Sequence, residues 1–116
     1  MIKIKRVYEK HETADGFRLL VDRLWPRGLT KEKAHVDEWM KEIAPSDALR
    51  KWFGHEPSKW PEFEKRYKAE LSKKRELLDE IRTLEKKHKT VTLVYGRNDE
   101  KQNQAVLILS ALKGKK

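Results

Sequence analysis

The chain has 116 residues, of which 37% are apolar and 41% charged, with a formal net charge of +9. This length suits one domain with one modest core, and the four Trp, three Tyr and three Phe argue against a disordered chain. No apolar run approaches the roughly 18 residues of a membrane span, and the N-terminus lacks the apolar core of a signal peptide. We therefore expect a cytoplasmic protein that does not bind membranes.

Two further compositional features restrict the chemistry. Cysteine is absent, which excludes disulfides, thiolate nucleophiles and thiolate metal ligands. The charge is uneven: residues 1–58 contain 12 Lys/Arg against 10 Asp/Glu, whereas residues 59–116 contain 16 against 9. A basic second half attracts nucleic acid if its charges face phosphates, or it is simply a solvated, lysine-rich helix face.

The first half of the chain predicts two strands and a helix. Apolar and basic residues alternate over residues 2–8, as in a half-buried strand. A turn signal at residues 15–16 (DG) precedes an apolar run at 17–25, which predicts a buried central strand ended by residues 26–28 (PRG). Thr30 can cap a helix that extends to Ile43, because the apolar residues there have 3.6-residue spacing.

The second half predicts three helices and one strand. Ser46 caps a short helix that Gly54 closes, and a long helix extends from residue 58 to about 87. Residues 90–95 (TVTLVY) predict a second buried strand. Asp99 and Gln102 resemble a capping box for a last helix to about Leu112. Residues 113–116 are expected to be frayed.

This order of elements, β, β, α, α, α, β, α, predicts a single compact α/β domain over residues 1–116. Helices would pack on a small, mostly parallel sheet. The link between the first two strands is only about eight residues, which is short for a helical crossover. Those strands could instead form a hairpin, in which case the sheet would be mixed.

Two polar loops follow the predicted buried strands, at residues 22–28 (DRLWPRG) and 95–99 (YGRND). In open α/β sheets, ligands bind beyond the carboxyl ends of the strands, near helix N-termini. If these two strands are parallel neighbours, both loops lie at one edge of the sheet. We therefore take Asp22 as a candidate catalytic residue, and the candidate ligand-binding residues are Arg23, Trp25, Arg27, Gly28, Tyr95 and Asn98.

Each residue of the DRLWPRG segment has a functional and a structural interpretation. Arg23 and Arg27 offer planar forks for a phosphate or carboxylate, and Gly28 lets backbone approach a ligand. Asp22 is either an acid–base group or the partner that holds an arginine in place. Trp25 either stacks on a ligand or fills the core. Ligand contact is favoured most for Arg27.

Other catalytic and binding motifs are missing. The four histidines do not have HxH or HExxH spacing, so we predict no metal site. The sequence has no GxGxxG, P-loop or GxSxG motif, so we predict no cofactor. Whether the protein is an enzyme stays open.

Four strings resemble a known family: DGFRLLVDRLWPRGLTKEK, WMKEIAPSDALRKWFGH, FEKRYKAEL and TLVYGRNDEKQNQA. They are similar to the YeaO-like members of domain-of-unknown-function family 488, over nearly the whole chain. The resemblance implies a compact α/β domain and gives weight to residues 22, 23 and 25–28. Longer relatives carry a cysteine near the end of the last strand, where this chain has Tyr95 and Gly96. Further positions that match the family pattern are Trp39, Lys41, Pro45, Ser46, Trp52, Phe53, Arg66, Tyr67 and Asn103, of which Asn103 joins the candidate ligand-binding residues.

Three functional hypotheses follow. The first is an enzyme or binding protein for a small anion, a phosphate or carboxylate, at the strand end formed by residues 22–27. The second is a nucleic-acid-associated module that uses the basic long helix, which we favour less. The third is a structural or interaction protein, in which the DRLWPRG segment serves the architecture alone. The oligomeric state does not follow from the sequence.

Overall fold

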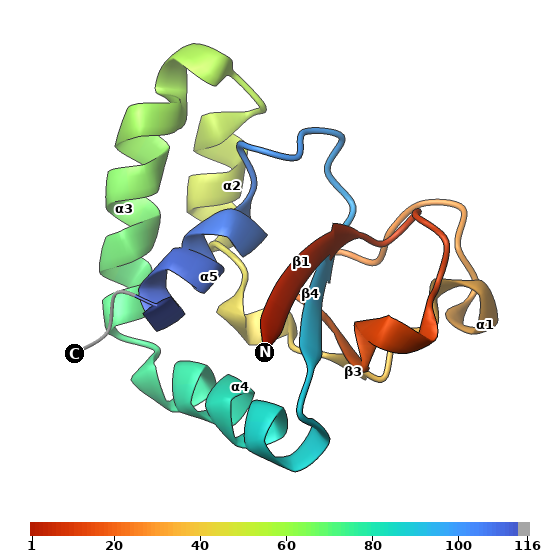
Figure 1. Ribbon diagram of the computed structural model, residues 1–116. Coiled ribbons are helices and arrows are strands. Elements are labelled where there is room, and N and C mark those ends of the chain that lie inside the picture. Colours follow the sequence, from red (N-terminus) through yellow and green to blue (C-terminus); the bar gives the residue numbers. More distant parts are fainter. Residues whose placement is uncertain (114–116) are drawn as a thin grey trace.

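Four short segments rich in β-branched and large apolar residues form one sheet in the computed structural model, which describes residues 1–113 (Figure 1). All the strand pairs are parallel, which confirms the predicted α/β class and the parallel form of the sheet. The order is β1-β4-β2-β3. The strands are β1 (Ile2–Arg6), β2 (Phe17–Leu20), β3 (Glu38–Trp39) and β4 (Val91–Tyr95).

β4 lies between the first two strands, so the alternative of a hairpin between β1 and β2 is wrong. Val91 is in register with Ile2 on one side and with Phe17 on the other. The link between β1 and β2 contains a 3-10 turn, η1 (Thr13–Asp15). The predicted second strand is also shorter than expected: β2 ends at Leu20, although the nitrogen of Val21 still donates to the carbonyl of Val94.

The two faces of the sheet bury different sets of side chains, because successive residues of a strand point to opposite faces. Leu19 and Leu93 belong to a large core cluster formed with the helices. Leu20 and Val94, one residue further along, belong to a smaller cluster with Val7 and Ala34. The sheet is therefore covered on both faces.

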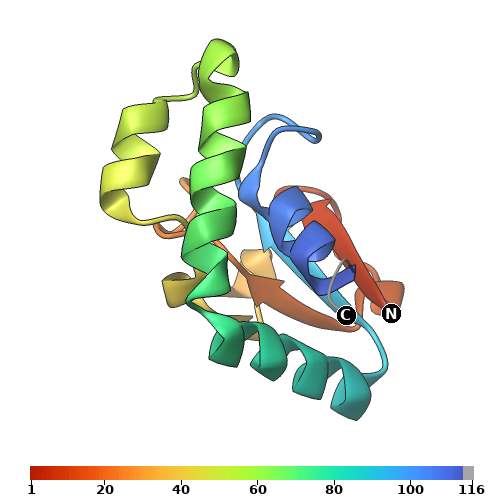
Figure 2. The ribbon, with the colours of Figure 1, turned by 90° about the vertical axis from the view of Figure 1, so that its left-hand side faces the viewer.

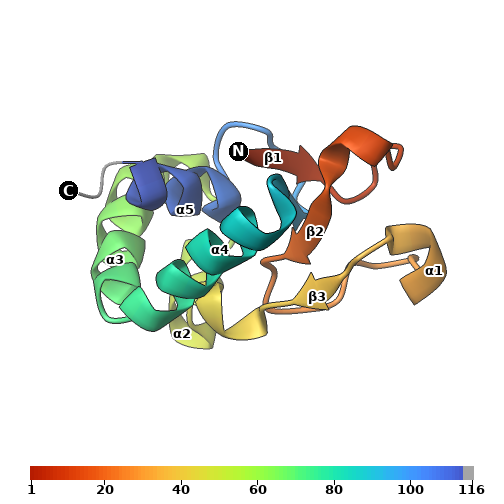
Figure 3. The ribbon, with the colours of Figure 1, turned by 60° about the horizontal axis from the view of Figure 1, so that its bottom comes forward.

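Most helices lie on one side of the strands, as Figure 3 shows. α5 contacts β1, and both α4 and α5 contact β4. Among residues 1–113, no helix is long and apolar enough to cross a membrane. The helices are α1 (Lys31–Ala34), which lies on the other side, and α2 (Asp47–Phe53), α3 (Trp60–Ser72), α4 (Arg75–His88) and α5 (Gln104–Lys113), with 3-10 turns η2 (Lys41–Ile43) and η3 (Pro57–Lys59).

The predicted helix from Thr30 to Ile43 is wrong beyond its first turn. Thr30 caps α1 as expected, by accepting a hydrogen bond from the nitrogen of Lys33. The chain then leaves the helix at His35, whose φ is 53°, and pairs with β2 instead. The nitrogen of Met40 donates to the carbonyl of Leu20 at 2.9 Å. Sheet pairing thus outweighs the helical periodicity of this segment.

The predicted long helix is two helices, which meet at Lys73 and Lys74. Figure 2 shows the chain turning sharply where α3 ends and α4 begins. Nζ of Lys74 donates to the carbonyl of Ala44 at 2.9 Å, which ties the turn to the segment before α2. The break lets α3 pack on α2 and α5 while α4 packs on β4.

The helix ends agree only partly with the prediction. Ser46 caps α2 and Gly54 closes it in a left-handed conformation, as predicted. The last helix begins later than expected, because Oδ1 of Asn103, not Asp99, accepts the hydrogen bond from the third helical residue, Val106. Of the tail expected to be frayed, Lys113 is the last helical residue and residues 114–116 lie outside the described part.

Candidate functional site

Asp22 lies just beyond the carboxyl end of β2, where its carboxylate accepts two hydrogen bonds. The backbone nitrogen of Gly96 donates to Oδ2 at 2.9 Å, and Nε2 of Gln104 donates to Oδ1. Gly96 follows β4 and Gln104 opens α5. The two loops that the sequence placed at one edge of the sheet are therefore joined through this carboxylate.

Burial controls the acidity of Asp22. Removal from water raises the pKa of its carboxyl group from 3.8 to about 6, against the opposing effect of the hydrogen bonds from Gly96 and Gln104. Both donors are neutral, and no ion pair engages Asp22 among residues 1–113. Binding or release of one proton by Asp22 at a pH near 6 therefore changes the charge of this site.

A groove of about 460 Å³ opens beside Asp22, which is within the range of roughly 300–1,000 Å³ for small-molecule sites. Its lining comes from the loops after β1, β2 and β4 and from α2, α3 and α5. Five cationic side chains face a single carboxylate. The charged and polar lining residues are Tyr8, Asp22, Arg23, Arg27, Arg50, Lys51, His55, Arg97 and Gln104, and the apolar ones include Leu24, Trp25, Pro26, Phe53 and Phe63.

Arg23 lines the groove but is held by the protein itself. Its Nη2 donates to the carbonyls of Ala44 and Pro45 at 3.1 and 3.2 Å, and its Nε donates to Pro45 at 3.3 Å. Nη1 lies 3.5 Å from the carboxylate of Glu42, which is exposed. Arg23 therefore fixes the turn before α2, but through these carbonyls and Glu42, and not through the pair with Asp22 that the structural interpretation predicted.

The side chain of Arg27, unlike that of Arg23, is not held by other residues in the described part of the protein. Its side chain is exposed, and within residues 1–113 it makes no hydrogen bond or ion pair. Only its backbone carbonyl is engaged, by the hydroxyl of Tyr8 at 2.8 Å. The next residue, Gly28, is exposed with a φ of 77° and does not line the groove. The guanidinium of Arg27 is thus available to a ligand.

Trp25 packs against the smaller core cluster, as its structural interpretation predicted, and it is also among the residues that line the groove. Nε1 donates to the carbonyl of Leu29 at 2.7 Å, and the ring meets Trp39 edge to face at 5.4 Å between centroids. These contacts lock the orientation of the ring in the smaller core cluster. Since Trp25 also lines the groove, this fixed residue adds apolar character to its wall.

Three other candidate residues do not line the groove. Tyr95 is buried in the large core cluster, and Asn98 is exposed in the loop after β4. Asn103 is buried and occupied twice, since it caps α5 and its Nδ2 donates to the carbonyl of Asp99 at 2.8 Å. The geometry gives these residues no contact with a ligand in the groove.

Several lining residues were not among the sequence candidates. The sequence placed Arg97 in the polar loop after β4, so its position near the site could have been predicted. In the structure its guanidinium lies over the ring of Phe53, at 4.7 Å from the ring centroid. Arg50 and Lys51 come from α2, and no local signal shows that this helix faces the sheet edge. Nε of Arg50 is buried without a hydrogen-bond partner among residues 1–113. For Gln104, the one indication in the sequence was its position near the predicted start of the last helix, where ligands often bind.

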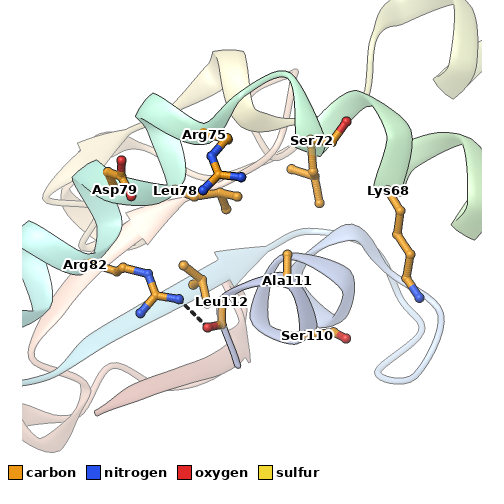
Figure 4. Close-up of a pocket in the computed structure, with 10 residues that line it drawn as sticks. Lys68, Ser72, Arg75, Leu78, Asp79, Arg82, Ser110, Ala111 and Leu112 are labelled. Carbon is orange, nitrogen blue, oxygen red and sulfur yellow. Dashed lines mark hydrogen bonds between the residues drawn. The ribbon is translucent and has the colours of Figure 1, made fainter. Parts of the chain in front are cut away.

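A second groove, of about 350 Å³, lies between α5 and the α3–α4 turn (Figure 4). Its floor is apolar, with Leu78 and Ala111, and Arg75 reaches over it. Arg82 donates to the carbonyl of Leu112 at the end of α5. None of the sequence candidates lies here, so the groove beside Asp22 remains the candidate site.

Comparisons with known proteins agree with the resemblance seen in the sequence. The family described as "Inactive DUF488-N3 subclade" matches residues 1–115. The uncharacterized protein YeaO of Escherichia coli (strain K12) is 41% identical over 112 residues, which are 97% of this chain and 96% of that protein. The uncharacterized protein Rv3073c of Mycobacterium tuberculosis is 38% identical over 106 residues, 91% of this chain and 89% of that protein. No solved structure matches significantly. The chain therefore belongs to the DUF488 family, in its inactive DUF488-N3 subclade.

Proposed function

We propose that this protein binds a small organic oxyanion, a phosphate or a carboxylate, in the groove beside Asp22, without turning it over. The observation that carries the proposal is the excess of cationic groups in this groove. Five Lys/Arg side chains line it together with one carboxylate. The groove also lies beyond the carboxyl ends of two parallel strands, where α/β proteins bind ligands.

Three of these cations have no polar partner within residues 1–113. The side chains of Arg27, Lys51 and Arg97 make no hydrogen bond or ion pair there, and Arg97 lies over an aromatic ring. Arginine pairs with planar or tetrahedral oxyanions through two parallel hydrogen bonds. These groups come from three separate segments, so a ligand that bridges them gains several charge-assisted contacts.

The apolar wall favours an organic ligand over a bare inorganic ion. Leu24 is 59% exposed, an unusual state for a large apolar side chain, and lies at the groove with Trp25. Phe53 and Phe63 line the other side. Ligand sites in proteins are mostly apolar, with a few placed polar groups, and this groove has that composition.

The family description supports binding without catalysis. The matching subclade is described as inactive, and the chain has no cysteine to supply a thiolate. Asp22, the candidate catalytic residue, holds the loop after β4 and the start of α5 through one hydrogen bond to each oxygen, from Gly96 and Gln104, and each oxygen keeps a further lone pair. We therefore assign Asp22 to the binding site, not to a catalytic centre. The proposal includes a cytoplasmic location, as expected from the sequence.

The nucleic-acid hypothesis has less support. The basic long helix on which it depended is interrupted at Lys73, and Nζ of Lys74 is occupied by the carbonyl of Ala44. Burial also lowers the pKa of Lys74. Lys68 pairs with Glu64 at 3.1 Å. Lys68 of α3 and Lys74 of the turn between α3 and α4 thus serve contacts within the protein.

Isothermal titration with sulfate and with organic phosphates and carboxylates tests the proposal. Arg27→Ala and Lys51→Ala should each weaken the binding by about tenfold, because a hydrogen bond to a charged group contributes roughly 1.5–3 kcal/mol. Lys87→Ala is a matched control, since Lys87 is exposed near the end of α4, at the opposite edge of the sheet. Equal effects of all three variants, or no saturable binding, would refute the proposed site.

A further inference from the structure

The floor of the groove poses an electrostatic problem for an oxyanion. Asp22 is the only carboxylate among the lining residues, and it lies where a ligand reaches the strand ends. Its hydrogen-bond partners, Gly96 and Gln104, are neutral. When Asp22 is ionised, it therefore repels an incoming oxyanion, and no hydrogen bond can form between two groups that both only accept.

Protonation reverses this relationship. A neutral carboxyl group has one O–H donor, while its other oxygen still accepts a hydrogen bond. The hydroxyl can donate to an oxyanion, a short hydrogen bond that is stronger than one between neutral groups. Burial makes this state easier to reach than in an exposed aspartate, because it raises the pKa of Asp22 to about 6 against the effect of the two hydrogen bonds.

We propose that the groove takes up an oxyanion together with one proton, which binds Asp22 and turns its carboxyl group into a hydrogen-bond donor to the ligand. The proton comes from solvent, and no covalent bond of the ligand changes. This inference rests on the proposed function and adds to it a ligand contact and a pH dependence.

The backbone around Asp22 fits such a contact. A Cβ atom on Gly96 would lie 3.0 Å from Oδ2 of Asp22, so glycine leaves this carboxyl group its position against the loop after β4. The first carbon of any other side chain would press on the carboxyl group. The same added Cβ atom would lie 3.8 Å from Cβ of Pro26, so Pro26 borders the same corner. Asp22 therefore lies between the loop after β4 and the groove that it lines.

Other charged or titratable residues line the same groove, and their effects must be separated from that of Asp22 in a test. They are Tyr8 after β1, Arg23 and Arg27 after β2, Arg50, Lys51 and His55 on or after α2, and Arg97 after β4, whereas α3 contributes Phe63 and α5 contributes Gln104. Of these, only His55 is of a residue type that ordinarily changes charge between about pH 5 and 8. Its protonation would also favour an anion, so His55 needs its own variant.

The experiment is isothermal titration with two ions whose charges stay constant from about pH 5 to pH 8: sulfate for the phosphate class and trifluoroacetate for the carboxylate class. The ion that binds more tightly shows whether the natural ligand belongs to the phosphate class or to the carboxylate class. We expect it to bind at least about tenfold more tightly at the lower pH, because one unit of pKa change on binding corresponds to a factor of ten. Titrations in buffers of different ionisation enthalpy should show uptake of about one proton near pH 6.5.

Two variants assign the proton. Asp22→Asn should bind the ion with nearly the same affinity at both pH values, because its side chain is neutral throughout. His55→Asn should keep the pH dependence of the wild type, and asparagine tolerates the left-handed backbone at this position, where φ is 61°. If Asp22→Asn does not fold, the proton uptake of the wild type and of His55→Asn still decides the assignment.

The outcomes separate this inference from the proposed function. Saturable binding with equal affinity at both pH values and no proton uptake would overturn the inference and leave the site intact. Loss of the pH dependence in His55→Asn alone would also overturn it. No saturable binding of these two ions, or of the organic phosphates and carboxylates titrated for the proposed function, to the wild type at either pH would overturn the proposed function itself.

Discussion

The backbone nitrogen of Gly96 donates a hydrogen bond of 2.9 Å to Oδ2 of Asp22, although 74 residues separate them in the chain. β2 and β4 are parallel neighbours that end on the two sides of this bond. Asp22 therefore has two consequences. It holds two loops together, and it places a titratable group at the floor of the groove.

Asp22 should make the protein less stable at neutral pH than at mildly acidic pH. Its pKa rises from 3.8 to about 6 on folding, so the folded state binds the proton more tightly. The stability contributed by Asp22 is therefore complete below about pH 4 and is lost as the pH rises through 6.

Urea unfolding of the wild type and Asp22→Asn at about pH 4 and pH 7.5 measures this effect. The variant should gain about 1–3 kcal/mol relative to the wild type on going from the lower to the higher pH, since one pKa unit corresponds to 1.36 kcal/mol. Any change that asparagine makes in the hydrogen bonds from Gly96 and Gln104 shifts the free energy of unfolding of the variant by the same amount at both pH values, so it cancels in this comparison. A difference independent of pH would contradict the raised pKa.

The two arginines of the DRLWPRG segment should separate stability from binding. Arg23→Ala leaves the carbonyl of Pro45 without its donor, while the carbonyl of Ala44 keeps Lys74, and should lower the free energy of unfolding by about 1–3 kcal/mol. Arg27→Ala removes an exposed side chain and should change it by less than about 0.5 kcal/mol. Thermal unfolding with and without sulfate compares the two. A large loss of stability in Arg27→Ala would support the architectural interpretation of this segment.

Gly16 should be intolerant of any side chain. Its φ is 65°, and a Cβ atom there would lie 2.4 Å from the carbonyl oxygen of Thr90, just before β4. Gly16→Ala should therefore cost at least about 2 kcal/mol, from the left-handed backbone and the clash together. Gly28→Ala is the control, because Gly28 has a similar φ of 77° and nothing within 4 Å. Equal losses in both variants would rule out the clash.

Retention on heparin tests the basic helices. If their charge acts only through the net charge of the protein, reversal of Lys73 and Arg75 should lower the eluting salt concentration as much as reversal of Lys86 and Lys87, at the far end of α4. A steep salt dependence that only the first pair abolishes would instead show a nucleic-acid surface.

Local signals in the sequence predicted those elements whose ends are determined locally. Thr30, Ser46 and Gly54 occupy the cap positions expected of them. The failure between residues 35 and 43 has a physical cause. Trp39 packs in the small core cluster, whereas Met40 and Ile43 belong to the large one, so the apolar spacing that resembles a helix serves two faces of a sheet.

The candidate site was predictable in part for the same reason. The convergence of Asp22 with the loop after β4 followed from the rule on strand ends, and the parallel pairing of β2 and β4 confirms its premise. The contribution of Arg50 and Lys51 was not predictable, because it depends on how the turn at Pro45 directs α2. That turn is held by Arg23, from a different part of the chain.

The place of β4 in the sheet also sets the order in which the protein can be assembled. β4 is the last strand to leave the ribosome, yet it is the one with which both β1 and β2 pair. The β1–β4–β2 ladder cannot form until β4, which begins at Val91, has emerged, and its closure spans most of the described chain. We therefore expect slow folding, as for other topologies of high contact order, with the edges of β1 and β2 exposed to aggregation until β4 arrives.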